Sequence, residues 1–528
     1  MITLENISYT HPHKEVLFSD ISFTVNTNSK AALIGNNGTG KSTLLKIIAG
    51  EILPTSGQVT VPENVYYVPQ IFGQYNHLTI AQLLRIDLKI NALKEILNGS
   101  ATNESFEVLN DDWTIEERCY DALNRWGLGN LDLAQKVDTL SGGQKTSAFL
   151  AGIHIHQPAL ILLDEPSNHL DVTSRRLLYD FIESTKSTLL VVSHDRKLLN
   201  LFDTIFELGS GCITTYGGNY DFYKEQKLLE INALSQDVLH AEKALRMAKE
   251  KERETLERQQ KLDNRGKAKQ EKAGVARIMM NTLRNNAENS TSKIKGVHEE
   301  KIKSISGELH ELRSALAGID KMKFGFENSA LPKKKVLFKA EAINYSYGKE
   351  YLWKEDLTFQ INCGDRLSVK GRNGSGKTTL VNILLGKLEP SRGMIHRADT
   401  QFVSIDQEYS LINNRSTIYE QAQQFNTNSL PEHEIKIRLH RFLFKRNDWD
   451  KLCEALSGGE KIRLILCCLT ISAQSPDMII MDEPTNNLDL HNVEVLAESI
   501  NAYKGTVIVI SHDTTFLEQI NSEQSIQL

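Results

Sequence analysis

The fold of this chain is decided by one octapeptide, Gly35-Asn36-Asn37-Gly38-Thr39-Gly40-Lys41-Ser42, which returns as Gly371-Arg372-Asn373-Gly374-Ser375-Gly376-Lys377-Thr378. Both copies fit the pattern GxxxxGK followed by Ser or Thr, and their lysines lie 336 residues apart. A short apolar run precedes each copy (31–34 and 367–369), and an amphipathic helix is predicted after each (42–49 and 378–385). Strand, glycine-rich loop and helix in this order form a phosphate-binding loop, so the sequence predicts two α/β nucleotide-binding domains.

Three further motifs are repeated in the same order behind each octapeptide. They are Leu-Ser-Gly-Gly at 140–143 and 456–459, Asp-Glu-Pro at 164–166 and 482–484, and Ser-His-Asp at 193–195 and 511–513. The aspartate of Asp-Glu-Pro lies 30 residues before the histidine in both copies. Two octapeptides with matching downstream partners exclude a chance glycine-rich turn.

The repeated residues have the chemistry of a site for a nucleoside triphosphate and Mg²⁺. Backbone N–H groups of a glycine-rich loop can surround phosphates at a helix N-terminus. We expect Lys41 and Lys377 to neutralise the outer phosphates, and the hydroxyls of Ser42 and Thr378 to coordinate Mg²⁺. The expected ATP-binding residues of the two loops are Gly35, Asn36, Asn37, Gly38, Thr39, Gly40, Lys41, Ser42 and Thr43, and Gly371, Arg372, Asn373, Gly374, Ser375, Gly376, Lys377, Thr378 and Thr379.

Acidic residues end the apolar runs that precede the two Asp-Glu-Pro prolines. Asp164 and Asp482 are expected at the carboxyl edge of each sheet, where a metal-bound water needs an oxygen partner. Glu165 and Glu483 follow them and are placed to polarise an attacking water. An Asp-Glu pair alone more often caps a helix, so its register with the other motifs carries the prediction.

The residues between the two copies have apolar positions at alternating steps of three and four. The two runs are Ile231, Leu234, Val238, Ala241, Leu245 and Ala248, and Ile302, Ile305, Leu309, Leu312, Leu316 and Ile319. This spacing predicts an antiparallel helical hairpin.

The expected tip of the hairpin is basic, with ten basic against three acidic residues over 258–295 in a chain whose net charge is −6. A solvated coiled-coil linker is one interpretation, but mixed charges would serve solubility equally, so the sign bias favours a polyanionic partner such as RNA. The expected RNA-binding residues are Arg265, Lys267, Lys269, Lys272, Arg277 and Arg284. Ile278, Met279, Met280 and Leu283 lie among them and form either the end of the hairpin core or an exposed apolar surface.

Length and composition exclude several classes of protein. A chain of 528 residues with 40% hydrophobic and 24% charged residues has the composition of a globular protein of several domains. No apolar run is long enough for a membrane helix and no secretory signal is visible, so we expect a cytoplasmic protein. The six cysteines form no CxxC pair and are expected to be small packing residues.

The ordered motifs resemble those of the ATP-binding cassette family, twice over and across nearly the whole chain. The resemblance implies two ATPase domains that sandwich two ATP molecules head to tail, with Mg²⁺ as a second cofactor. It implies signature loops at Ser141, Gly142 and Gly143 and at Ser457, Gly458 and Gly459, and switch histidines at His194 and His512, which act with Glu165 and Glu483. Gln70 and Gln407 resemble the Q-loop glutamines and join Ser42, Asp164, Thr378 and Asp482 as expected metal-site residues. Residues 168–171 and 486–489 resemble the D-loops.

Adenine needs a flat partner, which is usually an aromatic ring before the phosphate loop. Tyr347 fits this role in the second copy. His11 occupies the matching position in the first copy, with Tyr9 two residues earlier. Each of these residues is alternatively a packing residue of a strand.

Two cassettes without a membrane domain, a charged helical linker and the sequences EPSNHLD and EPTNNLD resemble the ABC-F group. The resemblance implies a monomeric, ribosome-binding translation factor whose linker tip reaches ribosomal RNA and P-site tRNA, with antibiotic target protection left open as one form of this role. The expected domains are residues 1–220, 221–330 and 331–528. The alternative functions are the ATPase of a transporter with separate membrane subunits, and a DNA-repair ATPase.

The first copy carries 21 extra residues between Gln70 and its signature loop, near 86–112. Leu88, Ala92, Leu93 and Ile96 have helical spacing there. This insertion resembles the arm with which ABC-F proteins contact the ribosome or tRNA, and a tolerated surface insertion is the alternative.

Overall fold

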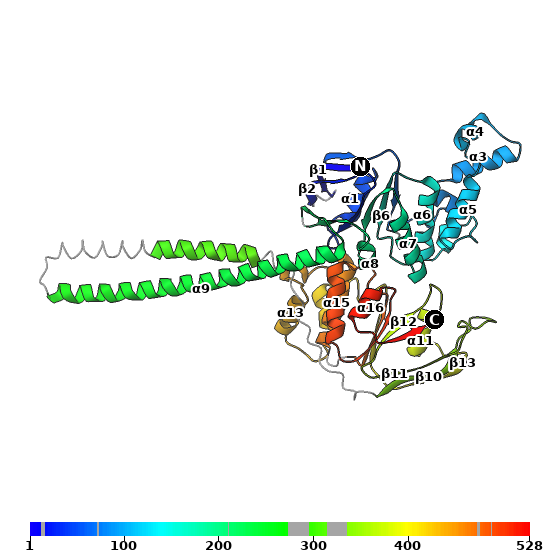
Figure 1. The fold of residues 1–528 in the computed structure, drawn as a ribbon. Helices are drawn as coiled ribbons and strands as arrows, with labels where there is room; N and C mark the ends of the chain where they lie inside the picture. Colours follow the sequence, from blue (N-terminus) through cyan, green and yellow to red (C-terminus); the bar gives the residue numbers. More distant parts are fainter. Residues whose placement is uncertain are drawn as a thin grey trace. The chain divides into compact units, whose positions relative to one another are not determined.

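A computed structural model describes residues 1–11, 16–70, 73–209, 211–272, 295–313, 335–472, 476–486 and 488–528, without side chains at 263 and 266–272. The chain divides into two compact units. One unit comprises Met1–Asp221 and Met322–Leu528 and contains both cassettes, and the other is Phe222–Lys321 (Figure 1). No helix in the described ranges is long and apolar enough to cross a membrane.

The first cassette is built on a six-stranded sheet in the order β5-β6-β7-β3-β8-β9, which is parallel except at β9. Its strands are β5 (Val65–Val68), β6 (Leu160–Asp164), β7 (Thr188–Val192), β3 (Lys30–Ile34), β8 (Thr204–Leu208) and β9 (Ile213–Tyr216). Every residue of β6 and β7 is buried, as expected for parallel strands that are covered on both faces. Because parallel strands end at one edge of a sheet, the ends of β3 and β6 bring the phosphate loop and the acidic pair together.

A smaller antiparallel sheet, β2-β1-β4, completes the first cassette. Its strands are β1 (Ile2–Thr10), β2 (Val16–Val25) and β4 (Ser56–Thr60). The helices are α1 (Lys41–Ile48), α2 (Ile80–Leu83), α3 (Asp87–Leu97), α4 (Asn103–Leu109), α5 (Ile115–Arg125), α6 (Gly142–His156), α7 (Val172–Ser184) and α8 (Arg196–Leu199). The amphipathic helix predicted after the first octapeptide is confirmed as α1, which begins one residue earlier than expected.

The extra residues of the first cassette form α3 and α4, which pack against each other at one end of the cassette (Figure 1). The helix indicated by the spacing is confirmed there as α3. Ala92 and Leu93 are buried, whereas Leu88 is 68% exposed and Ile90, which was not part of that pattern, is buried. Leu88 precedes Ile90 by two residues, which is about 200° around the helix, so the two side chains point to opposite faces and only that of Ile90 reaches the core.

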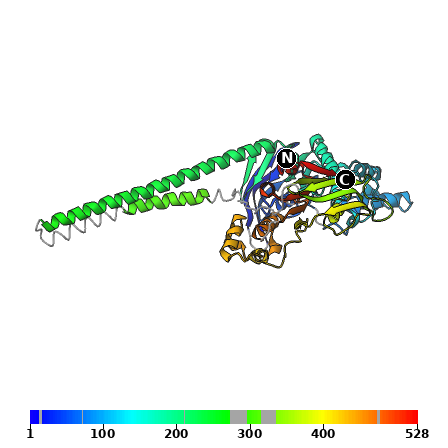
Figure 2. The ribbon, with the colours of Figure 1, turned by 90° about the horizontal axis from the view of Figure 1, so that it is seen from below.

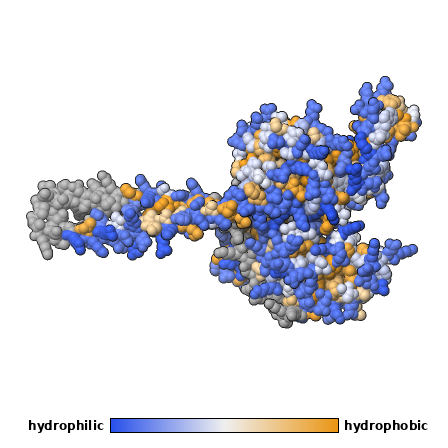
Figure 3. Space-filling model, viewed as in Figure 1, coloured by the Kyte–Doolittle hydropathy of each residue, from blue (hydrophilic) through white to orange (hydrophobic). Residues whose placement is uncertain are grey.

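Apolar side chains also remain on the surface of this insertion. Leu97, Phe106 and Trp113 are exposed, and the rings of Phe106 and Trp113 meet edge to face. Figure 3 shows apolar side chains gathered on this end of the cassette.

The second cassette repeats the arrangement with a five-stranded parallel sheet in the order β14-β15-β16-β12-β17. The strands are β14 (Phe402–Ile405), β15 (Met478–Asp482), β16 (Thr506–Ile510), β12 (Arg366–Lys370) and β17 (Gln524–Gln527). Its antiparallel sheet contains β11 (Leu357–Asn362), β10 (Val336–Asn344) and β13 (Arg392–Arg397). Its helices are α11 (Lys377–Leu384), α12 (Ile418–Gln424), α13 (Glu432–Arg441), α14 (Gly458–Ile471), α15 (Leu490–Ala502) and α16 (Thr514–Gln519). The two cassettes therefore have the predicted α/β architecture.

Five of the six cysteines are buried, in agreement with the predicted packing role. Cys212 is exposed, so the prediction is wrong at this position. It lies in the turn between β8 and β9, where the chain reverses at the surface and a small side chain has no core to join.

The second unit is an antiparallel helical pair, as predicted. Helix α9 (Tyr220–Lys272) has 53 residues, which corresponds to about 80 Å at 1.5 Å per residue. A second helix over 295–313 runs beside it in both ribbon views (Figures 1 and 2). Val238 and Ala241 are buried against Leu309, so heptad positions of both runs meet as expected. Leu316 and Ile319 lie outside the described residues.

Candidate nucleotide sites

The first phosphate loop connects β3 to α1 and encloses the ammonium group of Lys41. Gly38 and Gly40 have φ angles of 84° and 97°, which favour glycine. A Cβ at Gly40 would lie 2.7 Å from the Leu17 side chain, so this turn packs against β2 only without one. Lys41 Nζ donates to the carbonyl oxygens of Gly35 (2.8 Å) and Asn36 (3.0 Å). Burial lowers the pKa of Lys41, and such a buried cation favours a neighbouring anion.

The acidic pair and the switch histidine of the first cassette lie beside this lysine. Glu165 Oε1 lies 3.3 Å from His194 Nε2. Burial raises the pKa of Glu165 to about 8 against the opposing charge of Lys41, and burial holds the pKa of His194 well below its usual value. The histidine is therefore neutral at neutral pH, and its ring can orient the glutamate.

Buried polar atoms around these residues lack hydrogen-bond partners. In the described part of the chain, Asp164 Oδ1 and His194 Nδ1 have none. Buried polar atoms are normally paired, so these atoms fit a site whose partners come from a bound polyanion, a metal ion and water.

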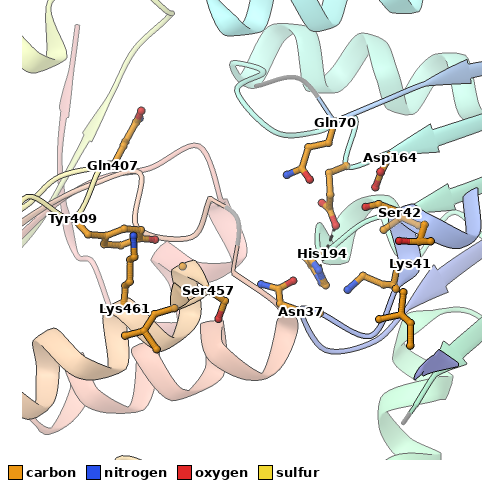
Figure 4. A pocket seen from close by; sticks show the side chains of 18 of the residues that line it. Asn37, Lys41, Ser42, Gln70, Asp164, His194, Gln407, Tyr409, Ser457 and Lys461 are labelled. Carbon is orange, nitrogen blue, oxygen red and sulfur yellow. Dashed lines mark ion pairs between the residues drawn. The ribbon is translucent and has the colours of Figure 1, made fainter. Parts of the chain in front are cut away.

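The expected metal-site residues of the first cassette converge on Asp164. Burial raises the pKa of Asp164, and the neighbouring hydroxyl groups of Ser42 and Tyr67 oppose this shift. Tyr67 donates to Asp164 Oδ2 at 3.3 Å. Gln70 lines the same cavity, and Figure 4 shows it on the same side as Ser42 and Asp164. Hydroxyl, amide and carboxylate oxygens are ligands that suit Mg²⁺.

The second cassette has the same residue types in a different arrangement. Lys377 Nζ donates to the Gly371 carbonyl at 3.0 Å and lies 2.7 Å from His512 Nε2. The same His512 nitrogen lies 3.5 Å from Glu483 Oε1, so His512 contacts both Lys377 and Glu483. Burial raises the pKa of Glu483 to about 7 and, together with Lys377, lowers the pKa of His512 to about 4. A neutral His512 can thus accept the hydrogen bond from the Lys377 ammonium group.

The acidic edge of the second cassette also differs from that of the first. Burial raises the pKa of Asp482, and the negative charge of Asp406 raises it further against the opposing charge of Lys377. Asp406 and Gln407 line a small cavity together with Asp482 and Glu483. Thr378, the expected hydroxyl ligand, is the second residue of α11 and is exposed.

A cavity of about 630 Å³ joins the first phosphate loop to the signature loop of the second cassette. Figure 4 shows Lys41, Asn37 and His194 facing Ser457 and Lys461 across it. Its volume is in the range of small-molecule sites. We name this cavity the Lys41 site; its lining includes His11, Gly38, Gly40, Lys41, Ser42, Thr43, Gln70, Asp164, Glu165, His194, Gln407, Ser457 and Gly458.

A second cavity, of about 180 Å³, has the reciprocal composition. Ser141, Gly142 and Gly143 of the first signature loop line it with residues of the second cassette, which are Asn373, Gln407, Glu483, Asn486 and His512. We name it the Lys377 site, since Lys377 contacts His512 in its wall. Each signature loop thus lies opposite the phosphate loop of the other cassette, which is the head-to-tail pairing that the family resemblance implies.

Hydrogen bonds connect the phosphate loops with the opposite D-loops. The Asn37 N–H donates to Asp489 Oδ2 at 3.0 Å, and Asn373 Nδ2 donates to the His169 carbonyl at 2.9 Å. Asp489 and Asp171 also cap α15 and α7 through the backbone N–H groups of Asn492 and Ser174. Asn487, another expected D-loop residue, lies outside the described residues.

The two candidate adenine-binding rings have different surroundings. His11 lines the Lys41 site and meets Tyr9 edge to face at 5.5 Å. Tyr347 is 72% exposed, and its hydroxyl lies 3.0 Å from the Thr379 Oγ1 atom beside the second phosphate loop. Both rings therefore lie next to a phosphate loop and are not packed into the core.

Sequence reasoning missed residues that belong to neither octapeptide. Lys461 and Tyr409 bring a cation and an aromatic ring from the second cassette into the Lys41 site. Trp353 donates from its indole nitrogen to the Ser375 carbonyl at 3.0 Å and supports the second phosphate loop. Arg175, on α7, lines the Lys377 site. Only Lys461 had a sequence signal, because Lys145 follows the first signature loop at the same position.

The candidate RNA-binding residues are only partly described. Arg265 is an exposed residue of α9. Lys267, Lys269 and Lys272 lie on the same helix, but their side chains are outside the described part of the chain. Arg277, Arg284 and the apolar residues 278–280 and 283 also lie outside it.

Comparison with known proteins supports the two cassettes. The family described as ABC transporter matches residues 18–168 and 354–486. The ATP-binding protein Uup of Escherichia coli K12 is 30% identical over 539 residues, which cover 96% of this chain and 77% of that protein. The uncharacterized ABC transporter ATP-binding protein YfmR of Bacillus subtilis is 30% identical over 554 residues, which cover 98% and 80% of the two chains.

Solved structures with a similar fold have the same tandem arrangement. The archaeal ribosome recycling factor aABCE1, solved in complex with the archaeal ribosomal stalk protein aP1, matches with a TM-score of 0.60 and 19% identity. The match covers 99% of this chain and 87% of that chain. A structure of RNase-L Inhibitor matches with a TM-score of 0.60 and 18% identity, covering 99% and 87%. At these identities the likeness concerns the fold.

Proposed function

The chain belongs to the ATP-binding cassette family, and from this premise we propose that it is a translation factor whose two ATP sites control its binding to the ribosome. Its relatives are ABC-F-type ATP-binding proteins, and its two cassettes make it an ATPase. The proposal joins two parts: ATP-dependent closure of the cassettes and a ribosomal partner for the basic hairpin.

The phosphate loops bind and orient the nucleotide. In the Lys41 site, the Lys41 ammonium group and the backbone N–H groups of the glycine-rich loop neutralise the phosphates. Ser42, Gln70 and Asp164 would hold Mg²⁺ with oxygen ligands, and Thr378, Gln407 and Asp482 would do so in the Lys377 site. The orphaned Oδ1 atom of Asp164 supports this assignment.

Glu165 and Glu483 are the proposed water-positioning residues. Mg²⁺-ATP, when bound, supplies the γ-phosphoryl group that the water attacks. The raised pKa values of both glutamates make them stronger proton acceptors than an exposed carboxylate. His194 Nε2 lies 3.3 Å from Glu165 Oε1 and can donate to it, which would hold that side chain toward the water. His512 Nε2 lies 3.5 Å from Glu483 Oε1 and would do the same once Lys377 leaves the histidine for a bound phosphate.

Closure follows from the shared walls of the two cavities. Lys41 and Ser457 come from different cassettes, yet they line one site. Both would contact the same phosphate group, so the cassettes are held together while that group is present and are released after its hydrolysis. This intramolecular pairing would let the chain act as a monomer.

A ribosomal partner is supported by charge and by relatives. Residues 258–295 carry ten basic against three acidic residues, so this part of the hairpin favours a polyanion such as ribosomal RNA and tRNA. Proteins with a similar fold are an archaeal ribosome recycling factor and, in a further solved structure, ribosome-bound ABCE1. The observation that carries the proposal is the basic hairpin between two complete ATP sites, since hydrolysis alone would not require it.

The test is co-sedimentation of purified ribosomes with the variant Glu165→Gln/Glu483→Gln, which should bind ATP without hydrolysing it. We expect this variant to sediment with ribosomes when ATP is present and to remain in the supernatant without it. The matched control is Lys41→Ala/Lys377→Ala, which should fail to bind in both conditions because its phosphate loops lack their cations.

Three results would contradict the proposal. They are a trapped variant free of ribosomes at low ionic strength, co-fractionation with membrane subunits, or tighter binding to DNA than to ribosomes. The last two would favour a transporter ATPase and a DNA-repair ATPase respectively. Protection of the ribosome from an antibiotic is one form of the proposed role, and drug-susceptibility tests in a host lacking the gene would address it.

A further inference from the structure

Arg175 lies in the contact between the two cassettes, at the start of α7. Its Nε donates to the Leu170 carbonyl at 3.1 Å, which fixes the side chain against its own D-loop. Its Nη1 donates to the His512 carbonyl of the second cassette at 3.4 Å. The same nitrogen lies 3.8 Å from Asp195 Oδ2. Asp195 is the residue that directly follows His194, the switch histidine of the first cassette. One guanidinium group therefore touches the histidine loops of both cassettes.

The surroundings of Arg175 hold it in this position. Its side chain is 12% exposed and that of Asp195 is 10% exposed. Tyr179, one turn further along α7, donates to the same Asp195 oxygen at 2.6 Å. A planar guanidinium group with several fixed donors suits such a bridge better than the single nitrogen of a lysine.

Arg175 also shares a small cavity with two carboxylates that correspond in the internal repeat. Asp195 and Asp513 line one small cavity between the cassettes, together with Arg175. Burial raises the pKa of Asp513, the negative charge of Asp195 adds to that effect, and Arg175 opposes both. Without Arg175, closure of the cassettes would bring these two like charges together with less compensation.

The second cassette has no arginine at the position of Arg175. When the two copies of the repeat are aligned at Asp171 and Asp489, the residue that corresponds to Arg175 is Val493. Val493 lines the same small cavity and has no charged group. Arg196 of the first cassette is a second cation at the contact, and its Nη2 lies 3.3 Å from Glu494 Oε1. The residue that corresponds to Arg196 in the second cassette is Thr514, which has no charge.

We infer that Arg175 is a positioning residue that joins the two histidine loops, and that it thereby couples ATP binding at the Lys377 site to ATP binding at the Lys41 site. His512 contacts Lys377 and Glu483, and Asp195 follows His194, which contacts Glu165. A movement of either histidine loop on ATP binding would therefore be transmitted to the other through one side chain.

The test is the ATP-binding isotherm of full-length Glu165→Gln/Glu483→Gln protein, measured by equilibrium dialysis so that hydrolysis does not interfere. Two coupled sites allow a Hill coefficient of up to two, and we expect about 1.5 or more for this parent. Adding Arg175→Met should lower the coefficient to about one and raise the half-saturating ATP concentration about tenfold.

Two further variants separate the bridge from charge and from folding. Arg176→Met removes a neighbouring exposed arginine of α7 and should leave the isotherm of the parent unchanged. Arg175→Lys keeps the positive charge near Asp195 and Asp513 but cannot span both loops, so it should also lose cooperativity. Thermal unfolding checks that each variant is folded, and Arg175→Lys carries the test if Arg175→Met unfolds.

Three outcomes would overturn the inference. They are a Hill coefficient of one in the parent, full cooperativity in the folded Arg175 variants, or an equal loss of cooperativity in Arg176→Met. Because none of these measurements uses ribosomes, failure of the inference is distinct from failure of the proposed translational role.

Discussion

Gly143→Ala is the substitution whose effect on cassette closure can be worked out most directly from the structure. Gly143 lies in the first signature loop, at the second residue of α6. A Cβ at this position would lie 2.6 Å from the His169 carbonyl oxygen and 2.8 Å from Asn373 Nδ2. These two atoms form the 2.9 Å hydrogen bond between the cassettes. The added methyl group therefore enters the hydrogen bond that joins the D-loop to the opposite phosphate loop.

The expected cost is the sum of two effects. Loss of the hydrogen bond costs about 1 kcal/mol, and displacement of a backbone carbonyl by an extra methyl group costs about 1 kcal/mol more. A total of about 2 kcal/mol corresponds to roughly 30-fold weaker ATP binding at the Lys377 site, where closure contributes to affinity. The fold of the isolated cassette should be unaffected, because Gly143 is helical and its φ is not positive.

The assay is equilibrium ATP binding to the Glu165→Gln/Glu483→Gln protein with and without Gly143→Ala. The matched control is Gly307→Ala, the same chemical change in a helix of the hairpin, where a Cβ would have no neighbour within 4 Å. The head-to-tail arrangement on which the calculation depends would be refuted if Gly143→Ala changed the ATP affinity less than threefold. An equal loss of ATP affinity in Gly307→Ala would refute it as well.

Three further predictions concern the hairpin, the second phosphate loop and the metal. Replacing Lys267, Lys269 and Lys272 by alanine should lower ribosome-stimulated ATPase activity severalfold more than basal activity, because phosphate contacts are lost; equal loss of both would assign the tip to folding. Trp353→Phe removes the donor to the Ser375 carbonyl and should destabilise the second phosphate loop by about 1 kcal/mol, which would raise the KM for ATP. An unchanged KM would show that other contacts hold this loop. Chelation of Mg²⁺ should abolish hydrolysis, and full activity in excess chelator would exclude the oxygen-ligand site.

The sequence was most informative where local chemistry has one structural solution. A glycine-rich loop between strand and helix can enclose a lysine in few ways, and both octapeptides have the predicted strand-loop-helix context. The heptads of the hairpin were predictable for the same reason, since spacing alone determines which faces of two helices meet.

Contacts between distant segments could not be predicted in this way. Arg175 and Trp353 belong to no motif, and their roles arise only when α7 approaches the second cassette or when Trp353 packs beside the second phosphate loop. Leu88 shows a different limit, because its spacing from Ala92 is helical but the buried face is set by Ile90 and Leu93. The spacing predicts that α3 is a helix, but which of its faces is buried depends on tertiary packing.

The most direct measurement of the central claim is a cryo-EM density map of Glu165→Gln/Glu483→Gln protein captured from cell lysate with ATP. The account predicts a ribosome-bound particle with nucleotide in both the Lys41 site and the Lys377 site, and with the hairpin against RNA. Particles without a ribosome, or a ribosome-bound chain whose hairpin touches no RNA, would contradict it.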